Sequence, residues 1–135
     1  MDDMQLDVQK IVSKYKLQML VYFGSYMTEN YHKESDIDIA YLSENPLIPI
    51  EKIGLLEDLI IAHRKSEIDL VDLRTAEPVL RCEIAINGKL LYEKEDGLFD
   101  RYYLYYIKRF YELKPVIDEE MNGIRKAIKE VIDNA

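Results

Sequence analysis

The chain alternates between segments whose hydrophobic residues have helical spacing and short segments with strand spacing. Residues 3–15 carry apolar side chains three or four positions apart and predict a helix. Four short apolar or alternating runs, each bounded by turn residues, predict strands: residues 19–23, 37–42, 67–73 and 89–95. Segments that start at Pro49 and Pro78 predict two further helices. Strands and helices interleave along the chain, which predicts an α/β or α+β domain.

The pattern changes after residue 97, where apolar residues keep three-to-four-residue spacing almost to the last residue. This spacing predicts a long amphipathic helix, or two in sequence, with Pro115 as the break or kink. A length of 135 residues, 48% of them apolar, suffices for one domain with a hydrophobic core. We therefore expect a single domain over residues 1–135, with its core at about 5–95 and a helical extension at about 97–133.

Composition and charge narrow the classes of function. The sequence has no run of about 18 apolar residues and begins acidic and polar, so we expect neither a membrane span nor a secretory signal, and a cytoplasmic protein. Cys82 is the single cysteine and has no partner for a disulfide or a zinc pair, so we expect it in the core. A net charge of −8 disfavours direct nucleic-acid binding, which relies on a basic surface. Any phosphate is expected to belong to a small ligand that binds with a divalent cation.

Candidate chemistry gathers around three carboxylates. Asp36 and Asp38 are two residues apart at the start of a predicted strand, so their side chains share a face. Asp69 sits inside another apolar strand, and carboxylate oxygens of this kind suit magnesium. Gly24 and Ser25 follow the first strand, where a tight turn with exposed amides can hold phosphate oxygens. Phosphates and metal ions are therefore expected to meet at one edge of the sheet.

Each part of this pattern also has a plainer explanation. A Gly-Ser pair after a strand is usually only a turn, and Asp-x-Asp at a strand entrance is often a solvated edge or a cap. Asp72 is out of phase with Asp69, so we expect it to face solvent, cap the strand end or support the site indirectly. Strand phase favours Asp69 over Asp72 as the third ligand. The combination is much more specific than its parts.

The combination resembles the nucleotidyltransferase superfamily that includes DNA polymerase beta. The resemblance rests on Gly24-Ser25, a gap of ten residues, Asp36-Ile37-Asp38 and the later Asp69. The short length and the sequence VDLRTAEPVLRCEIAINGKLLYE are similar to the minimal nucleotidyltransferases, in particular the antitoxin half of HEPN-MNT toxin-antitoxin pairs. The resemblance implies a small mixed sheet flanked by helices, with a C-terminal helical tail.

It also implies residue roles. Asp36, Asp38 and Asp69 would hold two Mg²⁺ ions, with Asp69 nearest the attacking hydroxyl, while Gly24 and Ser25 hold the triphosphate. The reaction would transfer AMP from ATP to a tyrosine of a HEPN ribonuclease toxin and silence it.

One departure from the family pattern keeps two other functions open. Many relatives carry Ala-Arg-Gly where this chain has Met27-Thr28-Glu29. The alternatives are a catalytically weak antitoxin that neutralises its toxin by occupation, and a small-molecule nucleotidyltransferase. Lys33 or His32 from the same loop can compensate for the missing arginine, although a solvated loop position is the better explanation for each of them.

The segment DRYYLYYIKRFYELK carries more aromatic residues than one helical stripe requires. We expect a HEPN-type partner to bind here, through Tyr102, Tyr103, Tyr105 and Tyr106. The alternatives are a helix that only covers the sheet, and base stacking, which the acidic charge disfavours. Arg81 is expected to form a surface ion pair or to reach the nucleotide or a carboxylate, and a helix-dipole contact explains His63.

Overall fold

A four-stranded mixed sheet forms the centre of the molecule. The computed structural model describes residues 2–134. Its strands are β1 (Leu17–Phe23), β2 (Ile37–Ser43), β3 (Ile68–Asp72) and β4 (Lys89–Glu93). They lie in the order β3-β2-β1-β4, with β2 and β3 parallel and the other two pairs antiparallel. The mixed α/β architecture expected from the sequence is confirmed.

Four helices accompany the sheet: α1 (Asp3–Tyr15), α2 (Pro49–His63), α3 (Pro78–Asn87) and α4 (Leu98–Asp133). α1 begins with a capping box, in which Asp2 and Gln5 each accept a hydrogen bond from the other's backbone N–H. α2 and α3 each begin with proline, whose missing N–H costs nothing in the first helical turn. The predicted helices therefore begin where their local signals place them.

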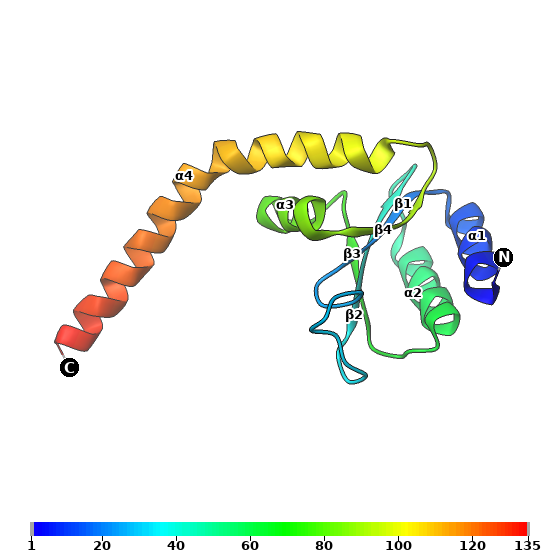
Figure 1. The fold of residues 1–135 in the computed structure, drawn as a ribbon, viewed down its shortest axis with the longest axis horizontal. Helices are drawn as coiled ribbons and strands as arrows, with labels where there is room; N and C mark the ends of the chain where they lie inside the picture. The colour runs from blue at the N-terminus through cyan, green and yellow to red at the C-terminus, as the bar shows by residue number, and fades with distance from the viewer. Residues whose placement is uncertain (1, 135) are drawn as a thin grey trace.

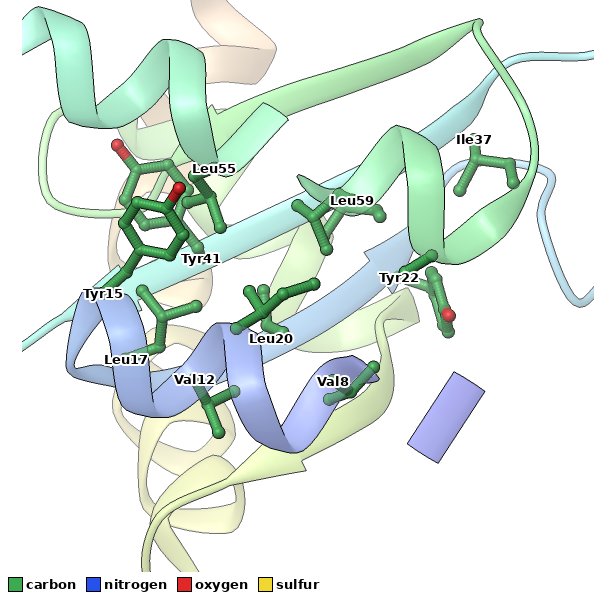
Figure 2. Close-up of a cluster of buried hydrophobic side chains, with 13 residues drawn as sticks. Val8, Val12, Tyr15, Leu17, Leu20, Tyr22, Ile37, Tyr41, Leu55 and Leu59 are labelled. Carbon is green, nitrogen blue, oxygen red and sulfur yellow. The ribbon is translucent and has the colours of Figure 1, made fainter. Parts of the chain in front are cut away.

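The helices cover the two faces of the sheet in pairs. α1 and α2 pack on one face, and α3 and the first part of α4 lie on the other (Figure 1). The core under α1 and α2 draws on alternate residues of β1 and β2: Leu20 and Tyr41 lie beside Leu59 and Leu55 of α2, and Tyr22 lies near the end of that helix (Figure 2). The core on the opposite face includes Met19, Val21, Ala40 and Ile84. Cys82 is buried as a free thiol, as expected.

The last helix is a single unit in spite of its proline. α4 runs from Leu98 to Asp133 with Pro115 inside it, and Figure 1 shows that it changes direction about midway. A proline removes one backbone hydrogen bond and bends a helix, and Tyr111, whose carbonyl loses that bond, is exposed to water. The expected kink is present, and the alternative of two separate helices is wrong.

The start of α4 is fixed to the sheet by a carboxylate. Glu93, the last residue of β4, accepts hydrogen bonds from the backbone N–H groups of Gly97 and Phe99, at 3.0 and 2.9 Å. This contact places the aromatic first half of α4 across α3. Among residues 2–134, no helix is long and apolar enough to cross a membrane.

Candidate active site

Gly24 and Asp38 meet at the end of the β1–β2 pair. Phe23 of β1 lies opposite Asp38 of β2 in the antiparallel register. Gly24 follows with φ of +71°, a left-handed conformation that glycine adopts without strain. A Cβ atom at position 24 would overlap the Oδ2 atom of Asp38. The glycine is therefore required both by the turn and by the closeness of the Asp38 carboxylate.

The second carboxylate comes from the neighbouring parallel strand. Asp38 and Asp69 are paired positions of β2 and β3, so their side chains leave the sheet on the same face. This is the face of Ala40 and Val71, which pack in the core with α3. Asp36 lies directly before β2, two residues from Asp38, and is exposed. The fold thus brings Asp36, Asp38 and Asp69 to one end of the sheet.

The surroundings of Asp38 shift the pKa of its carboxyl group. Burial raises the pKa of Asp38, and the negative charges of Asp69, Asp36 and Glu83 raise it further. Glu83, on α3, is a fourth acidic residue near the site that the sequence pattern did not reveal. Its only signal in the sequence is a carboxylate on the helix that follows β3, which carries no information until the packing face of that helix is known. Mutual repulsion of this kind favours a cation nearby.

The donor chemistry suits a hard divalent cation, although the side chains do not converge on one point. Within residues 2–134, no three His, Cys, Asp or Glu side chains are close enough together to hold a metal ion as they stand. The acidic groups around Asp38 offer carboxylate oxygens, the ligands that Mg²⁺ prefers. Asp36 and Asp69 are both exposed, so their side chains have room to rotate toward a common centre.

Asp72 lies on the other face of the sheet. Its carboxylate forms an ion pair with Lys52 of α2 at 3.5 Å and accepts a hydrogen bond from the backbone N–H of Arg74 at 2.9 Å. Tyr41, its neighbour in the parallel register, belongs to the core under α2. Asp72 therefore caps the end of β3 and holds α2, as one of the sequence-based expectations had it.

The loop after Gly24 is folded back on itself. The carbonyl of Ser25 accepts hydrogen bonds from the backbone N–H of Thr28 at 3.0 Å and from its hydroxyl at 2.5 Å. Met27 adopts a left-handed conformation, with φ of +66°, and its side chain is exposed. Glu29 is exposed as well. Met27, Thr28 and Glu29 thus form a surface turn beside Ser25.

A cluster of aromatic side chains packs this loop against β1. The ring of Tyr26 contacts Tyr22 of β1 and Tyr31 edge-on, with centroids 4.6 and 5.0 Å apart. Lys65 holds the far side of the loop, because its ammonium donates to the carbonyl of Lys33 at 2.7 Å. Sequence analysis missed this support, whose only signal was the recurrence of tyrosine in an otherwise polar loop.

His63 connects this aromatic cluster to the last turn of α2. Its Nδ1 lies 2.8 Å from the carbonyl of Leu59, and its Nε2 lies 2.7 Å from the hydroxyl of Tyr22. The carbonyl can only accept, so Nδ1 carries the proton and Nε2 accepts from Tyr22. Burial lowers the pKa of His63, which keeps the ring neutral at pH 7. The contact expected with the C-terminal end of α2 is present as the hydrogen bond to the Leu59 carbonyl, and the neutral ring makes it.

The tyrosines of α4 divide between the interior and the surface. Tyr102 packs into the core on the α3 side of the sheet, and Tyr106 accepts a hydrogen bond from Arg81 at 3.2 Å. Tyr105 is 58% exposed, beside Leu104 at 63%. Arg81 also donates to the carbonyl of Arg74 at 2.6 Å, so it joins α3 to α4, and none of the ion pairs among residues 2–134 includes it.

One hollow of the surface is separate from these carboxylates. It has a volume of about 220 Å³ and lies between α1 and α2, lined in part by Lys10, Lys14 and Asp58. These helices cover the face of the sheet opposite to the one that carries Asp38. The chemistry of the carboxylates therefore has no connection with this hollow.

Comparison with known protein families agrees with the carboxylate geometry. The family model described as polymerase beta, nucleotidyltransferase matches residues 7–97. The chain belongs to this nucleotidyltransferase family. The matched range runs from α1 to the end of β4 and includes Gly24, Ser25 and the three aspartates. The resemblance drawn from those residues is confirmed at the level of the family and of the fold.

Two curated relatives within the nucleotidyltransferases carry the same name. The protein adenylyltransferase MntA of Shewanella oneidensis is 42% identical over 86 residues, which cover 62% of this chain and 61% of that protein. The protein adenylyltransferase MntA of Aphanizomenon flos-aquae is 28% identical over 123 residues, 84% of this chain and 81% of that protein. The alignment with the Shewanella relative thus spans about three fifths of either chain.

Solved nucleotidyltransferase structures show the same fold in toxin-antitoxin assemblies. A chain of a toxin-antitoxin crystal structure with AMP-PNP has a TM-score of 0.69 and 31% identity, over 87% of this chain and 98% of that chain. A chain of the complex of a tri-AMPylated Shewanella oneidensis HEPN toxin with MNT antitoxin has a TM-score of 0.59 and 32% identity, over 87% of this chain and 96% of that chain. The similarity extends beyond the family model into α4.

Proposed function

We propose that this protein is an adenylyltransferase that transfers AMP from ATP to a hydroxyl group of a HEPN-type toxin and thereby acts as its antitoxin. One observation carries the proposal: Gly24, Asp38 and Asp69 meet at one end of the sheet, although 45 residues separate the first from the last. The names of the two MntA relatives and the AMPylated toxin in a similar complex support the choice of substrate and partner.

The carboxylates suit two Mg²⁺ ions. Asp36, Asp38 and Asp69 supply oxygens that would hold them, and bound magnesium offsets the charge that develops on the entering and leaving oxygens. The repulsion that raises the pKa of Asp38 supports this assignment, because a cation relieves it. Gly24 and Ser25 would hold the triphosphate, since the left-handed turn at Gly24 lets the ligand approach the backbone beside Asp38.

The reaction is an in-line displacement at the α-phosphorus. The acceptor hydroxyl oxygen bonds to that phosphorus, and the bond to the oxygen that bridges the α- and β-phosphates breaks. Pyrophosphate leaves with the bridging oxygen, and the hydroxyl proton passes to the carboxylate of Asp69. The protein contributes mainly position and charge, as is general for nucleotidyl and phosphoryl transfer. The reaction requires ATP and therefore places the protein in the cytoplasm.

The exposed aromatic surface of α4 is the proposed contact with the toxin. Tyr105 and Leu104 supply apolar surface that the domain itself leaves uncovered, and Tyr103 is half-buried next to them. Tyr102 and Tyr106 act indirectly, because their packing against α3 and the sheet fixes the helix that carries the exposed residues.

A binding antitoxin without catalysis is the second candidate. The observation in its favour is the turn at Met27-Thr28-Glu29, which places an exposed acidic residue in the loop that follows the proposed phosphate contacts. A carboxylate that faces a triphosphate would weaken nucleotide binding.

Intact-mass spectrometry separates the candidates. The purified protein is incubated with Mg²⁺, ATP and the small protein encoded by the neighbouring gene, and the mass of each chain is followed. The proposal expects AMP-sized increments on the partner, absent with the variant that combines Asp36→Asn and Asp38→Asn. A double variant that still neutralises the partner, without any transfer, would establish the binding antitoxin instead. Asp58→Asn, a change in α2 on the opposite face, is the matched control and retains transfer.

A further inference from the structure

The C-terminal half of α4 has no covering element within the described chain. Every residue from 118 to 134 is exposed, and Figure 1 shows this part of the helix projecting away from the sheet and its helices. An isolated single helix of this length is marginal in water. A stable projecting helix therefore calls for a surface that packs against it.

The projecting helix carries a continuous apolar seam. Its members follow one another at intervals of four, three, four and three residues: Ile117, Met121, Ile124, Ile128 and Val131. This is the repeat of a coiled coil, in which two apolar positions recur in every seven residues and face a partner helix. Met121, Ile124, Ile128 and Val131 are 44%, 52%, 54% and 72% exposed. Such a seam on a solvated helix is costly unless a second helix covers it.

The charges of the projecting helix change sign along its length. Asp118, Glu119 and Glu120 form an acidic block, Arg125, Lys126 and Lys129 form a basic block one turn further on, and Glu130 and Asp133 are acidic again near the end. Asp118 and Arg125 each follow a seam residue directly. A helix with this arrangement is complementary to itself when it is reversed. Two antiparallel copies place each acidic block beside the basic block of the other, whereas two parallel copies in register place each block beside its like.

We propose that the projecting half of α4 pairs with the same segment of a second copy of this protein, as an antiparallel two-helix coiled coil centred between Met121 and Ile124. The seam fits this register, and the charges of Asp118 and Arg125 agree with it. When Met121 faces Ile124 of the second copy, Ile117 faces Ile128 of that copy. The same register brings Asp118 beside Arg125 of the second copy, a position that antiparallel coiled coils use for ion pairs. A two-fold axis then relates the copies, as in most homodimers.

The proposal is independent of nucleotide transfer, because neither the seam nor the charge blocks belong to the carboxylate site. Sedimentation equilibrium of the full chain, without nucleotide or partner protein, measures it directly. The unsubstituted protein is expected to have twice the mass of one chain. Ile124→Glu is expected to halve that mass, because it places a charge at the centre of the seam.

Val116→Glu is the matched control. Val116 and Ile124 are both 52% exposed, but Val116 lies a quarter turn away from the seam. The control is expected to keep the dimer, and circular dichroism with a melting curve verifies that the domain stays folded in each variant. A dimer that persists in Ile124→Glu would overturn the proposal, and so would a monomer at every concentration of the unsubstituted protein.

Cysteine cross-linking determines the direction of the pair. The native Cys82 is buried, so an introduced thiol is the reactive one. Mixing Ile117→Cys with Ile128→Cys under mild oxidation is expected to give a disulfide between the two variants. When the Ile117→Cys variant is oxidised on its own, a disulfide between two of its copies would indicate a parallel pair and overturn the antiparallel arrangement. A free chain that is monomeric, and whose projecting helix gains hydrogen-exchange protection only with the toxin, would assign the seam to the toxin.

Charge reversal provides a second, independent test. Asp118→Arg alone and Arg125→Asp alone are each expected to weaken the dimer, because each places like charges side by side. The variant with both changes is expected to recover the dimer, since the ion pairs form again with their polarity exchanged. Loss of the dimer in the combined variant would contradict the proposed register.

Discussion

Asp38 and Asp69 are paired residues of the parallel strands β2 and β3, and their side chains leave the same face of the sheet. The parallel direction matters because α2 connects the two strands and carries the chain back to the end at which β2 began. A carboxylate close to the start of each strand then reaches one site. The predictions below follow from this arrangement and from the groups around it.

Asp69 and Asp72 should have different roles although both lie on β3. We expect Asp69→Asn to abolish AMP transfer and to leave the fold intact. Asp72→Asn should keep transfer and lose about 1 kcal/mol of stability, because it weakens the ion pair with Lys52 and the hydrogen bond to the N–H of Arg74. Transfer assays and urea unfolding of both variants check this. Loss of transfer in a folded Asp72→Asn variant would contradict the assignment.

Gly24→Ala should damage both stability and activity. The left-handed backbone at position 24 costs about 1–2 kcal/mol for a residue with a Cβ, and that Cβ would displace the Asp38 carboxylate. Gly97→Ala is the matched control, because Gly97 also has a positive φ, +89°, but lies at the start of α4. Both variants should lose stability in denaturant unfolding, Gly24→Ala the more because of the overlap with Asp38, and only Gly24→Ala should lose transfer.

The decrease of the transfer rate at acidic pH should depend on the ionisation of Asp38. Burial and the neighbouring charges of Asp69, Asp36 and Glu83 raise its pKa above the ordinary value of 3.8, and metal binding requires the ionised form. At a limiting Mg²⁺ concentration, where protons and metal compete for the Asp38 carboxylate, transfer should therefore fall off on acidification at a higher pH than an ordinary aspartate would give. Glu83→Gln should move this decrease to lower pH, because it removes one of the charges that raise the pKa. An unchanged pH dependence of transfer in the Glu83→Gln variant would show that another group determines it.

The same raised pKa makes Asp38 unfavourable for folding at neutral pH. The folded state holds the Asp38 proton more tightly than the unfolded state, so this contribution to stability is full below pH 3.8 and is lost as pH rises through the folded pKa. Asp38→Asn should therefore raise the melting temperature at pH 7 while it abolishes transfer. Calorimetric melting at pH 7 and at acid pH checks this, and the gain should shrink at acid pH.

His63 should make stability fall on mild acidification. Its pKa is lowered in the folded state, so the unfolded state takes up the proton more readily, and stability is full above pH 6.5 and is lost as pH falls below that value. His63→Gln should remove this slope and cost about 1 kcal/mol at pH 7, because the hydrogen bond from Tyr22 is lost. His32→Gln, in the exposed loop, should keep the slope. Urea unfolding across pH 5–8 measures each variant.

The sequence was sufficient for those parts of the fold that depend on local signals. The capping box at Asp2 and the left-handed Lys16 bound a helix that the apolar spacing already located. The meeting of Gly24, Asp38 and Asp69 followed from strand alternation and a known motif. These features are local or repeat in a fixed pattern, so one chain is enough to recognise them.

Contacts between distant elements were beyond the sequence. Arg81 was expected near a ligand or an ion pair, but its partners on α4 and beyond β3 depend on how α3 lies across the sheet. The hydrogen bond that His63 accepts comes from a tyrosine 41 residues away. Pro115 indicated a possible end of the helix, and only the solvation of the carbonyl it leaves free allows α4 to continue.

The contrast between the two halves of α4 has a consequence for turnover. The first half unfolds only with the domain, because Tyr102 and the Arg81–Tyr106 hydrogen bond tie it to the rest. In a dissociated chain the second half can fray without disturbing the core, so a protease that cuts there samples dissociation and local opening and not global unfolding. A cell could thus remove the tail of this protein while the catalytic body stays intact. The lifetime of the two halves would then be set by different equilibria.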